Sequence, residues 1–441
     1  MPDGPAHQLA DRIASRTAVV GVIGMGYVGL PAARAFVDAG FRVLAFDSDP
    51  AKIDALNAGR TYLAHLGDRF VADLRATGRF EAADPSRLGE PDALLLCVPT
   101  PLDETLRPDL SYVEATARDV ARALRPGQLV CLESTTYPGT TRDVLAPILA
   151  TSGFNLGHDF FVAFSPERED PGRPGHTTRT IPKLVGGLDD RSRALAADLY
   201  GAAIDTVVPV SSAEVAEAAK LLENIFRAVN IALVNEMKVA LTEMGIDVFE
   251  VVRAAATKPF GFMPFEPGPG LGGHCIPIDP FYFSWKAAQI RQPARFIELA
   301  GEVNRAMPAY VIDRLERALA DAGTPLAGSR VLVLGLAYKP NVDDVRESPA
   351  LELITLLRER GSDVTYHDPH VPRTHKMRRY DLGMTSVPLT PEALAGVDAV
   401  VIATAHKAVD YRLVGEHAKL IIDTRDAMRS VPAPRARIVK A

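Results

Sequence analysis

The chain has 441 residues, of which 47% are hydrophobic and 24% charged, and its formal net charge is −6 at pH 7. This length predicts two or three domains, each large enough for its own core. Acidic and basic residues are mixed along the chain, so we expect no nucleic-acid partner. No apolar run approaches the ~20 residues that span a bilayer, so we expect no membrane insertion.

The three cysteines, Cys97, Cys131 and Cys275, are too few and too scattered for a disulfide framework or a zinc site. The first two lie within apolar strand-type segments, where buried packing is the expected role. The first sixteen residues lack the apolar core of a secretion signal. We therefore expect a protein of the reducing cytoplasm. His367, Asp368 and His370 lie close together in sequence, but without further convergent ligands they favour a structured loop, and we expect no metal.

A glycine-rich turn follows the first strand-type segment. Residues 17–23 form a short apolar run that leads into Gly24-Met25-Gly26-Tyr27-Val28-Gly29 and then into a helical pattern. The next strand, residues 41–46, ends at Asp47. A strand, GxGxxG, a helix and an acidic residue about 20 positions on are together typical of a dinucleotide site.

Each residue of this motif has a physical role. Gly24 makes the tight turn, Gly26 lets the backbone approach a pyrophosphate, and Gly29 lets helix and strand pack closely. The helix N-terminus supplies N–H donors. Asp47 would accept hydrogen bonds from the ribose hydroxyls and repel a 2′-phosphate, so the predicted cofactor is NAD rather than NADP.

Two further strands, residues 93–98 and 129–132, run into small polar residues. Ligands bind at the carboxyl ends of strands in open α/β sheets, which places Thr100 and Thr135 at the nicotinamide half of the cofactor. The residues expected to contact NAD on these grounds are Gly24, Gly26, Tyr27, Val28, Gly29, Asp47, Thr100 and Thr135.

A carboxylate lies at the end of another strand, residues 160–164, which runs into Ser165-Pro166-Glu167-Arg168. Glu167 is a candidate general base or water-orienting group. Taken alone, a solvated carboxylate explains it equally well.

A long helix is predicted in the middle of the chain. Ser211-Ser212-Ala213-Glu214 indicates a capping box, and helix-favouring residues continue to Gly245, which implies a helix of about 50 Å. Lys220 and Asn224 share one face of it, although a solvated face is the simpler explanation of such a pair. Apolar residues recur at helical spacing: Val215, Leu222, Phe226, Val229, Leu233 and Met237. A helix of this kind commonly joins two domains and packs against a second copy, so we expect a homodimer or a higher homo-oligomer.

The thirteen residues 268–280 contain four glycines and three prolines, which excludes a helix interior or a central strand. This rigid loop carries Cys275 between His274 and Asp279. A thiolate is the reactive form of cysteine, and nearby cations lower its pKa; a turn with a buried cysteine is the alternative. A second capped helix, which begins at Asp247, precedes the loop.

The last part of the chain repeats the opening theme. A strand and turn at residues 330–339 precede a helix near residues 349–360 and a strand that ends at Asp368, as the earlier strand ends at Asp47. GxGxxG is absent, which argues against a second dinucleotide, and Lys339 suits a phosphate-bearing substrate.

The predicted fold is therefore α/β, with two Rossmann-like, doubly wound domains joined by a long central helix and a helical middle domain. The predicted boundaries are 1–209, 210–322 and 323–441.

From about Val19 to Arg425 the chain resembles the nucleotide-sugar 6-dehydrogenases, the family of UDP-glucose and GDP-mannose dehydrogenases. The motifs that carry the resemblance are GVIGMGYVGLP, ESTTYPGTT, FSPERED, AEAAKLLENIFRAVNIALVNE, GPGLGGHCIPIDP and GLAYKPNVDDVRESP. KPFGFMPFEPGPGLGGHCIPIDPFYFSWKA and HDPHVP are most similar to UDP-N-acetylglucosamine 6-dehydrogenases. UDP-glucose enzymes usually have GGSC and Lys-Asp where this chain has GGHC and Ile-Asp.

The resemblance implies oxidation of CH2OH to carboxylate with two NAD+ consumed. It implies that Cys275 forms a thiohemiacetal and then a thioester, that Lys220 and Asn224 stabilise the oxyanion, and that Asp279 handles the proton through a water. Glu167 would be the base in thioester hydrolysis, with Thr135 positioning the water.

The resemblance also places Arg346 near the cofactor or a neighbouring subunit and gives His274 a structural or substrate-contact role. The residues expected to bind substrate are Glu167, Arg168, Lys220, Asn224, Gly272, Gly273 and Lys339.

Three functions remain open from the sequence. The leading hypothesis is an NAD-dependent UDP-N-acetylglucosamine 6-dehydrogenase that makes a uronic acid for a surface polysaccharide precursor. UDP-N-acetylgalactosamine, UDP-N-acetylmannosamine and UDP-glucose stay open as substrates, because motifs do not encode the orientation of one hydroxyl. The second hypothesis is a two-electron dehydrogenase of the 3-hydroxyacid type, which needs no thiol. The third is a catalytically silent scaffold that senses NAD or a nucleotide.

Overall fold

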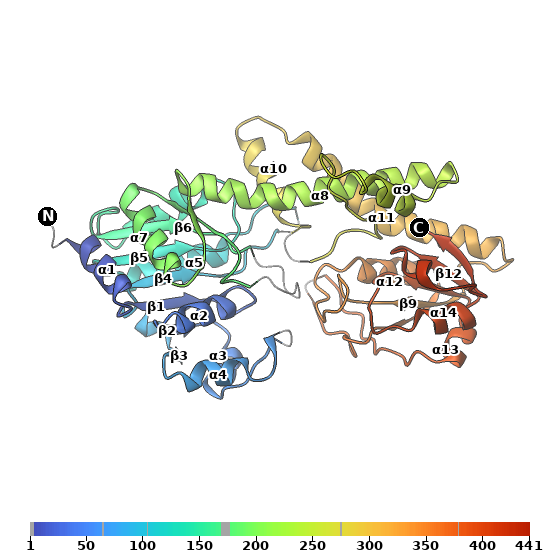
Figure 1. Cartoon of the computed structure of the whole chain (residues 1–441), viewed down its shortest axis with the longest axis horizontal. Helices are drawn as coiled ribbons and strands as arrows, with labels where there is room; N and C mark the ends of the chain where they lie inside the picture. Colours follow the sequence, from blue (N-terminus) through green and yellow to red (C-terminus); the bar gives the residue numbers. More distant parts are fainter. Residues whose placement is uncertain (1–3, 64–65, 104, 169–176, 274–275, 378) are drawn as a thin grey trace. The chain divides into compact units, whose positions relative to one another are not determined.

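The computed structural model describes residues 4–63, 66–103, 105–168, 177–273, 276–377 and 379–441. Two compact units make up the chain (Figure 1). Unit 1 contains Met1–Glu223 and Phe281–Gln292, and unit 2 contains Asn224–Pro280 and Pro293–Ala441. The three-domain division expected from the sequence stays a prediction.

Unit 1 is built on an eight-stranded sheet of order β3-β2-β1-β4-β5-β6-β7-β8. Its paired neighbours are parallel except β6 and β7, which are antiparallel. Strands β4, β5 and β6 are buried at every position, as strands covered on both faces must be. The strands are β1 Val19–Ile23, β2 Arg42–Phe46, β3 Phe80–Ala82, β4 Ala93–Leu96, β5 Gln128–Leu132, β6 Phe160–Phe164, β7 Lys183–Gly187 and β8 Val207–Pro209.

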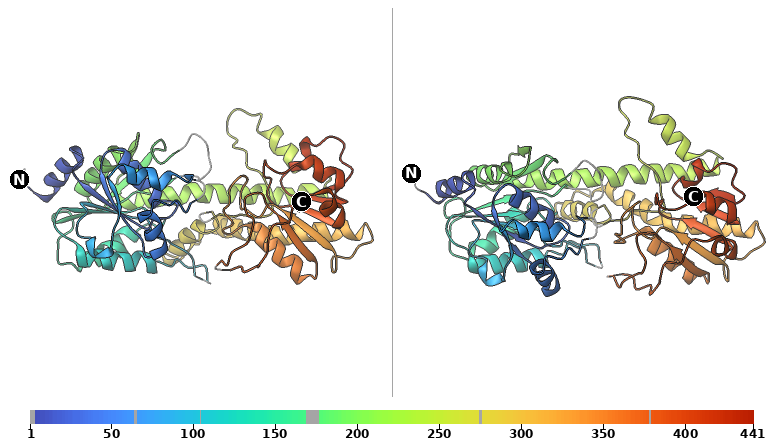
Figure 2. Two further views of the ribbon diagram at one scale, coloured as in Figure 1. Left: turned by 90° about the horizontal axis from the view of Figure 1, so that it is seen from below. Right: turned by 60° about the horizontal axis from the view of Figure 1, so that its bottom comes forward.

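Helices lie on both faces of this sheet (Figure 2). Strand β1 shows why: Val20 and Val22 belong to a core with α1, α2 and α7, whereas Val19 and Ile23 pack against a core with α5, α6 and the start of α8. The helices are α1 Pro5–Ala14, α2 Gly29–Asp38, α3 Pro50–Asn57, α4 Phe70–Ala76, α5 Ser111–Ala123, α6 Ala146–Ala150 and α7 Asp190–Gly201. The doubly wound fold predicted for this part of the chain is confirmed.

The long central helix is α8, Ala213–Glu243, which begins in unit 1 and ends in unit 2. Gly245 stops it in a left-handed conformation (φ +76°), with its N–H donated to Thr242 O at 3.0 Å. The predicted capping box is wrong in detail. Ser212 precedes the first helical residue, and its hydroxyl accepts from Val215 N at 3.4 Å, whereas Glu214 pairs with Arg142.

Unit 2 contains a five-stranded, fully parallel sheet of order β10-β9-β11-β12-β13. Helices α11 and α12 pack on one core of this sheet, and α13 and α14 pack on the other. Its strands are β9 Arg330–Leu334, β10 Asp363–His367, β11 Ala399–Ile402, β12 Leu420–Asp423 and β13 Arg437–Lys440. Its helices are α9 Val248–Ala255, α11 Arg295–Ala320, α12 Pro349–Glu359, α13 Pro391–Gly396 and α14 Tyr411–His417. The second Rossmann-like sheet is therefore confirmed.

The helical connections agree with most of the predicted capping. Asp247 caps α9 by accepting from Phe249 N at 3.0 Å. The described residues of the glycine and proline loop, 268–273 and 276–278, are not helical, and α10, Asp279–Gln289, follows them. Several helices lie outside the predicted elements, among them α1 and α11. Because α11 contains Pro308, its apolar face is interrupted by a residue that usually breaks helices. No helix in the described part of the chain is long and apolar enough to cross a membrane.

A buried carboxylate ties α8 to the turn after β5. Glu217 accepts hydrogen bonds from Gly139 N at 2.6 Å, from Thr141 N at 2.9 Å and from the Thr141 hydroxyl at 2.7 Å. It is fully buried, and burial raises its pKa to about 7 because the charged form loses its hydration.

This raised pKa predicts how stability depends on pH. The proton is bound more tightly in the folded chain, so stability is highest below the unfolded pKa and falls by about 3 kcal/mol as the pH rises through 7. We expect Glu217→Gln to lower the thermal transition at every pH, since its amide cannot accept from all three donors. The loss between pH 5 and pH 8 should be smaller in the variant than in the wild type. Equal losses, measured by calorimetry, would contradict the assignment.

Candidate active site

The predicted cofactor residues other than Arg346 lie at one edge of the unit 1 sheet. Strands β1, β4, β5 and β6 are parallel neighbours, so their carboxyl ends lie side by side. The segments that follow them carry Gly24, Thr100, Thr135 and Glu167. The Ser134 hydroxyl donates to Val98 O at 2.7 Å and holds the ends of β4 and β5 together.

The glycine turn has the steric requirements of a dinucleotide site. Gly24 has φ +93°, and a Cβ there would lie 2.4 Å from Cys97 O. A Cβ on Gly29 would lie 2.0 Å from Gly24 O. Around Gly26 no atom lies within 4 Å of an added Cβ. The first and third glycines are therefore needed for packing, and the second leaves the backbone open to a pyrophosphate.

Asp47 closes this turn from the end of β2. It accepts from Met25 N at 2.8 Å, from Asp49 N at 2.9 Å and from Lys52 Nζ at 3.0 Å. The open glycine turn, the start of α2 and this carboxylate fit an NAD molecule, which accepts hydride when bound. Tyr27 and Val28 lie in the same turn, and Thr100 and Thr135 are half-buried beyond it.

A buried ion cluster stands behind Glu167. Lys183 Nζ lies 2.8 Å from Glu133 Oε2 and 3.1 Å from Glu167 Oε2. The Tyr200 hydroxyl donates to Glu133 Oε1 at 2.7 Å. Glu167 is therefore a largely covered, ion-paired carboxylate with a side-chain exposure of 10%, and the solvated alternative is wrong. The adjacent Arg168 is held by Glu223 at 2.6 Å.

Lys220 and Asn224 lie on buried positions of α8, at 7% and 6% exposure, so the solvated-face explanation of this pair is wrong. Asn224 Nδ2 donates to Asp279 Oδ2 at 2.5 Å, which joins the helix to the end of the cysteine-bearing loop within unit 2. His274 and Cys275 lie outside the described residues.

We call residues 268–278 the thiol loop and residues 336–347 the lysine loop. The two pack together: a Cβ on Gly272 would lie 2.7 Å from Tyr338 Cβ, and Gly273 N donates to Arg346 O at 3.0 Å. The Arg346 guanidinium is held by Asp344 at 2.6 Å. Lys339 lies next to Tyr338 with its ammonium 5.5 Å from that ring. The structure thus brings together Gly272, Gly273, Lys339 and Arg346.

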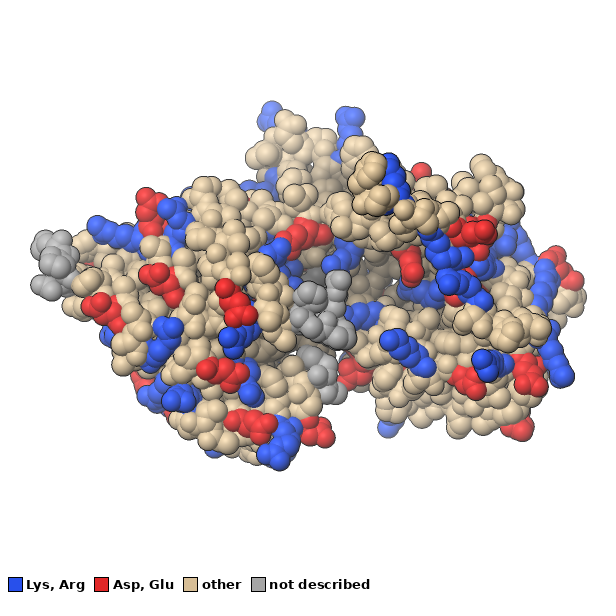
Figure 3. Space-filling model, viewed as in Figure 1, with Lys and Arg blue, Asp and Glu red and all other residues tan. Residues whose placement is uncertain are grey.

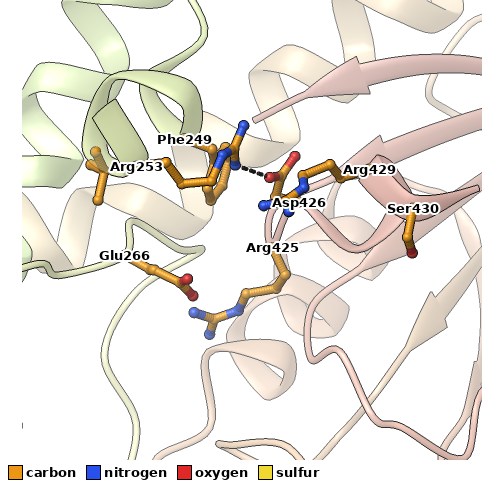
Figure 4. A pocket seen from close by; sticks show the side chains of 8 residues that line it. Phe249, Arg253, Glu266, Arg425, Asp426, Arg429 and Ser430 are labelled. Atoms are coloured by element: carbon orange, nitrogen blue, oxygen red, sulfur yellow. Dashed lines mark hydrogen bonds and ion pairs between the residues drawn. The ribbon is translucent and has the colours of Figure 1, made fainter. Parts of the chain in front are cut away.

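Unit 2 also has a basic pocket of about 320 Å³ that the sequence did not predict (Figure 4). Arg425 and Glu266 approach each other there, and Arg253 pairs with Asp426. Burial lowers the pKa of Arg425 to about 10, which leaves it charged at neutral pH. Basic side chains also gather around the C-terminus on the face in Figure 3. The pocket is lined by Phe249, Val252, Arg253, Glu266, Arg425, Asp426, Arg429 and Ser430.

Three family models cover most of the chain. The NAD binding domain, the central domain and the UDP binding domain of the UDP-glucose/GDP-mannose dehydrogenase family match residues 18–204, 214–306 and 332–430. The chain belongs to the UDP-glucose/GDP-mannose dehydrogenase family. The resemblance inferred from the sequence is confirmed, and the protein is an NAD-dependent nucleotide-sugar dehydrogenase.

Relatives of this dehydrogenase differ in the sugar they are named for. UDP-N-acetyl-D-mannosamine dehydrogenase of Pyrococcus horikoshii is 34% identical over 420 residues, 94% of this chain and 96% of that one. UDP-N-acetyl-D-glucosamine 6-dehydrogenase of Pseudomonas aeruginosa is 34% identical over 417 residues, 92% and 96% of the two chains. A solved structure of UDP-D-ManNAc dehydrogenase from Pyrococcus horikoshii has a TM-score of 0.86 at 33% identity, covering 96% of this chain and 99% of that one.

Sequence reasoning missed the residues whose partners are distant in the chain. Lys183 and Glu133 are 50 residues apart, and Arg253 and Asp426 are 173 apart. Their positions after strands could have indicated these residues. Glu133 follows β5, and Arg425 follows β12, just as Glu167 follows β6.

We expect the preference for NAD+ over NADP+ to depend on Asp47. In Asp47→Ala the ribose hydroxyls lose their acceptor and Lys52 is freed to pair with a 2′-phosphate. We expect KM for NAD+ to rise about tenfold. The ratio of kcat/KM for NADP+ to that for NAD+ should rise at least about hundredfold, as measured by steady-state kinetics.

Asp49→Ala is the matched control. It removes a carboxylate that caps α3 by accepting from Ala51 N at 2.9 Å. We expect a loss of about 1 kcal/mol in stability and an unchanged cofactor ratio. Equal effects of the two substitutions on the ratio of kcat/KM for NADP+ to that for NAD+ would show that Asp47 does not bind the ribose hydroxyls.

Proposed function

We propose that this dehydrogenase oxidises C6 of UDP-N-acetyl-D-glucosamine to the carboxylate, giving UDP-N-acetyl-D-glucosaminuronate for a surface polysaccharide precursor. The observation that carries the proposal is the Asn224–Asp279 hydrogen bond, because it joins the buried face of α8 to the loop that bears Cys275. The substrate would be a UDP-N-acetylhexosamine, and the reaction would take place in the cytoplasm, where thiols stay reduced.

The nucleotide part of the substrate fits the basic pocket of unit 2. Arg425 remains charged there, and guanidinium groups bind phosphate oxygens in bidentate geometry. Four of the lining residues, including Arg425 and Arg429, lie within the match to the UDP binding domain. Lys339, which lies in the lysine loop, would bind an oxygen of a substrate phosphate.

The chemistry has two oxidations. In the first, C6 loses a hydride to NAD+ and its hydroxyl loses a proton, which gives an aldehyde. The Cys275 thiolate then forms a C–S bond to that carbonyl, and the oxyanion takes up a proton to give a thiohemiacetal. Loss of a second hydride from C6 to another NAD+, with loss of the hydroxyl proton, gives the thioester.

The chain's own residues would handle charge and protons in these steps. The Lys220 ammonium and the Asn224 amide would stabilise the oxyanion that forms when the thiolate adds. Asp279, held by Asn224, would pass the proton through a water. Glu167, oriented by Lys183, would activate the water that Thr135 positions, and that water would break the C–S bond and release the acid.

Two sugars have specific support. The thiol-loop motif is most similar to UDP-N-acetylglucosamine enzymes, and the Pseudomonas aeruginosa relative carries that name. UDP-N-acetylmannosamine is the second candidate, since the Pyrococcus horikoshii relative is named for it. The two sugars differ in the configuration of C2, which is remote from the reacting C6.

A substrate panel decides between them. We expect kcat/KM for UDP-N-acetylglucosamine to exceed those for UDP-N-acetylmannosamine, UDP-N-acetylgalactosamine and UDP-glucose by at least about tenfold, the effect of one lost hydrogen bond or clash at a substituent of the sugar ring. A higher value for another sugar would overturn the choice of substrate and leave the reaction type standing.

The covalent mechanism predicts a specific effect of the thiol. We expect Cys275→Ala to lose acid formation by at least about a thousandfold, as loss of a nucleophile does. Cys97→Ala and Cys131→Ala are matched controls, because burial raises the pKa of both thiols and keeps them inert. They should form acid at near wild-type rate. Wild-type acid formation by the Cys275 variant, measured by mass spectrometry of the product, would sink the mechanism.

We further propose a homodimer through α8. This helix exposes a row of apolar side chains, a costly arrangement unless a second copy covers it. The row repeats at alternating intervals of seven and four: Val215, Leu222, Phe226, Leu233 and Met237. This spacing keeps the side chains on one face of the helix.

If α8 forms the dimer interface, substitutions in this row should lower the mass of the assembly. Leu222→Glu with Leu233→Glu should shift the chain from dimer to monomer in sedimentation velocity. Leu106→Glu, at an exposed leucine outside α8, should leave the dimer intact. A double variant that remains dimeric would place the interface elsewhere.

A further inference from the structure

The carboxyl edge of the unit 2 sheet holds a buried Asp368–His406 pair that the proposed reaction does not use. His406 is completely buried, and its Nε2 lies 3.0 Å from Asp368 Oδ2. Asn341 N donates to His406 Nδ1 at 3.0 Å. Since Nδ1 accepts, Nε2 carries the proton and donates to Asp368, which fixes the ring in one tautomer.

Asp368 is itself locked in place. One of its oxygens accepts from Leu336 N at 2.6 Å and Ala337 N at 3.0 Å. The other accepts from His370 N at 2.7 Å and Val371 N at 3.0 Å. These donors and His406 hold the pKa of Asp368 at about 2, so the carboxylate is charged at neutral pH. It is a fixed point for any group that hydrogen-bonds to it.

The lysine loop is fastened to this fixed point at several places. Its first residues donate to Asp368, and the Thr404 hydroxyl donates to Ala337 O at 2.6 Å. Further along, Asn341 adopts a left-handed conformation with φ +63°, which is uncommon outside glycine. The backbone N–H of Asn341 donates to His406, and the side-chain oxygen of Asn341 accepts from Lys407 N at 2.9 Å.

The other side of the same loop faces the thiol loop. Tyr338 packs on Gly272 and Gly273, where an added Cβ would lie 2.7 Å and 3.0 Å from its side chain. Arg346 O accepts from Gly273 N. Lys339 lies between the Asp368 anchor and the Asn341 anchor in sequence. A shift of the loop at Asn341 would therefore move both Lys339 and the surface on which the thiol loop rests.

We propose that His406 is a positioning residue for nucleotide-sugar binding: by bridging Asp368 to Asn341 N, it sets the place of Lys339 and of the lysine loop. The inference rests on the proposed function for the identity of the ligand. His406 itself does not touch the substrate; it acts through the loop. Its effect should fall more on the nucleotide sugar than on NAD, because Arg346 is the one predicted NAD residue in the lysine loop and the others lie in unit 1.

Two conservative variants separate the two hydrogen bonds of His406. His406→Asn keeps an acceptor oxygen near the position of Nδ1 but does not reach Asp368. His406→Gln keeps a donor near the position of Nε2 but leaves Asn341 N without its acceptor. The probes are UDP and NAD+, titrated calorimetrically into the full chain. The exchange of the amide hydrogens of residues 336–347 is followed in parallel by mass spectrometry.

We expect His406→Gln to weaken UDP binding about tenfold and His406→Asn to weaken it by less than about threefold, the difference expected when a backbone N–H loses its acceptor. KM for the nucleotide sugar should follow the same order, with a smaller change in KM for NAD+. Amide exchange in the lysine loop should accelerate in the glutamine variant and not in the asparagine variant. His375→Gln, at an exposed histidine of unit 2, should match the wild type.

Equal UDP affinity in both His406 variants, or an equal loss of NAD+ affinity, would overturn the inference. So would unchanged amide exchange in the glutamine variant. Failure of the proposed function is a separate result, because it would show as a wild-type chain that turns over no nucleotide sugar, whereas the exchange measurement still tests whether His406 holds the loop.

Discussion

In both sheets, a carboxylate at the end of the second strand accepts a hydrogen bond from the turn after the first strand. Asp47 accepts from Met25 N, and Asp368 accepts from Leu336 N. A buried carboxylate must be hydrogen-bonded, and a turn of free N–H groups attracts an anion. The arrangement therefore has two outcomes: the turn can stay open to a ligand, or the protein can fill it with its own groups.

The two units differ in which outcome they reach. In unit 1 no atom lies within 4 Å of a Cβ added to Gly26, and α2 begins three residues later at Gly29. The turn can therefore receive a pyrophosphate. In unit 2 the matching positions are Ala337 and Pro340, and Asp368 is enclosed by backbone donors and His406. The connection from β9 to α12 then forms the lysine loop. The same geometry thus leaves an open turn in unit 1 and a closed turn followed by the lysine loop in unit 2.

Much of the fold could be predicted from the sequence because its signals are local. Apolar strands end at small polar residues, Gly245 marks the end of one helix, and Asp247 marks the start of the next. The glycine turn with Asp47 indicates NAD. The helix α11 escaped because Pro308 breaks its pattern. The Lys183 cluster, the Arg425 pocket and the His406 bridge escaped for a different reason. The Lys183 cluster and the His406 bridge gather residues on or near separate strands, which only the order of strands in the sheet brings together. The Arg425 pocket joins α9 to the segment after β12.

The central claim is a four-electron oxidation in which a thiol captures the aldehyde, and product stoichiometry tests it most directly. Purified enzyme would be given a limiting amount of UDP-N-acetylglucosamine and excess NAD+, and the NADH formed at completion would be counted. The account predicts two NADH for each sugar consumed. One NADH for each sugar, with aldehyde as the product, would contradict it and favour a two-electron dehydrogenase in which Cys275 has no covalent role.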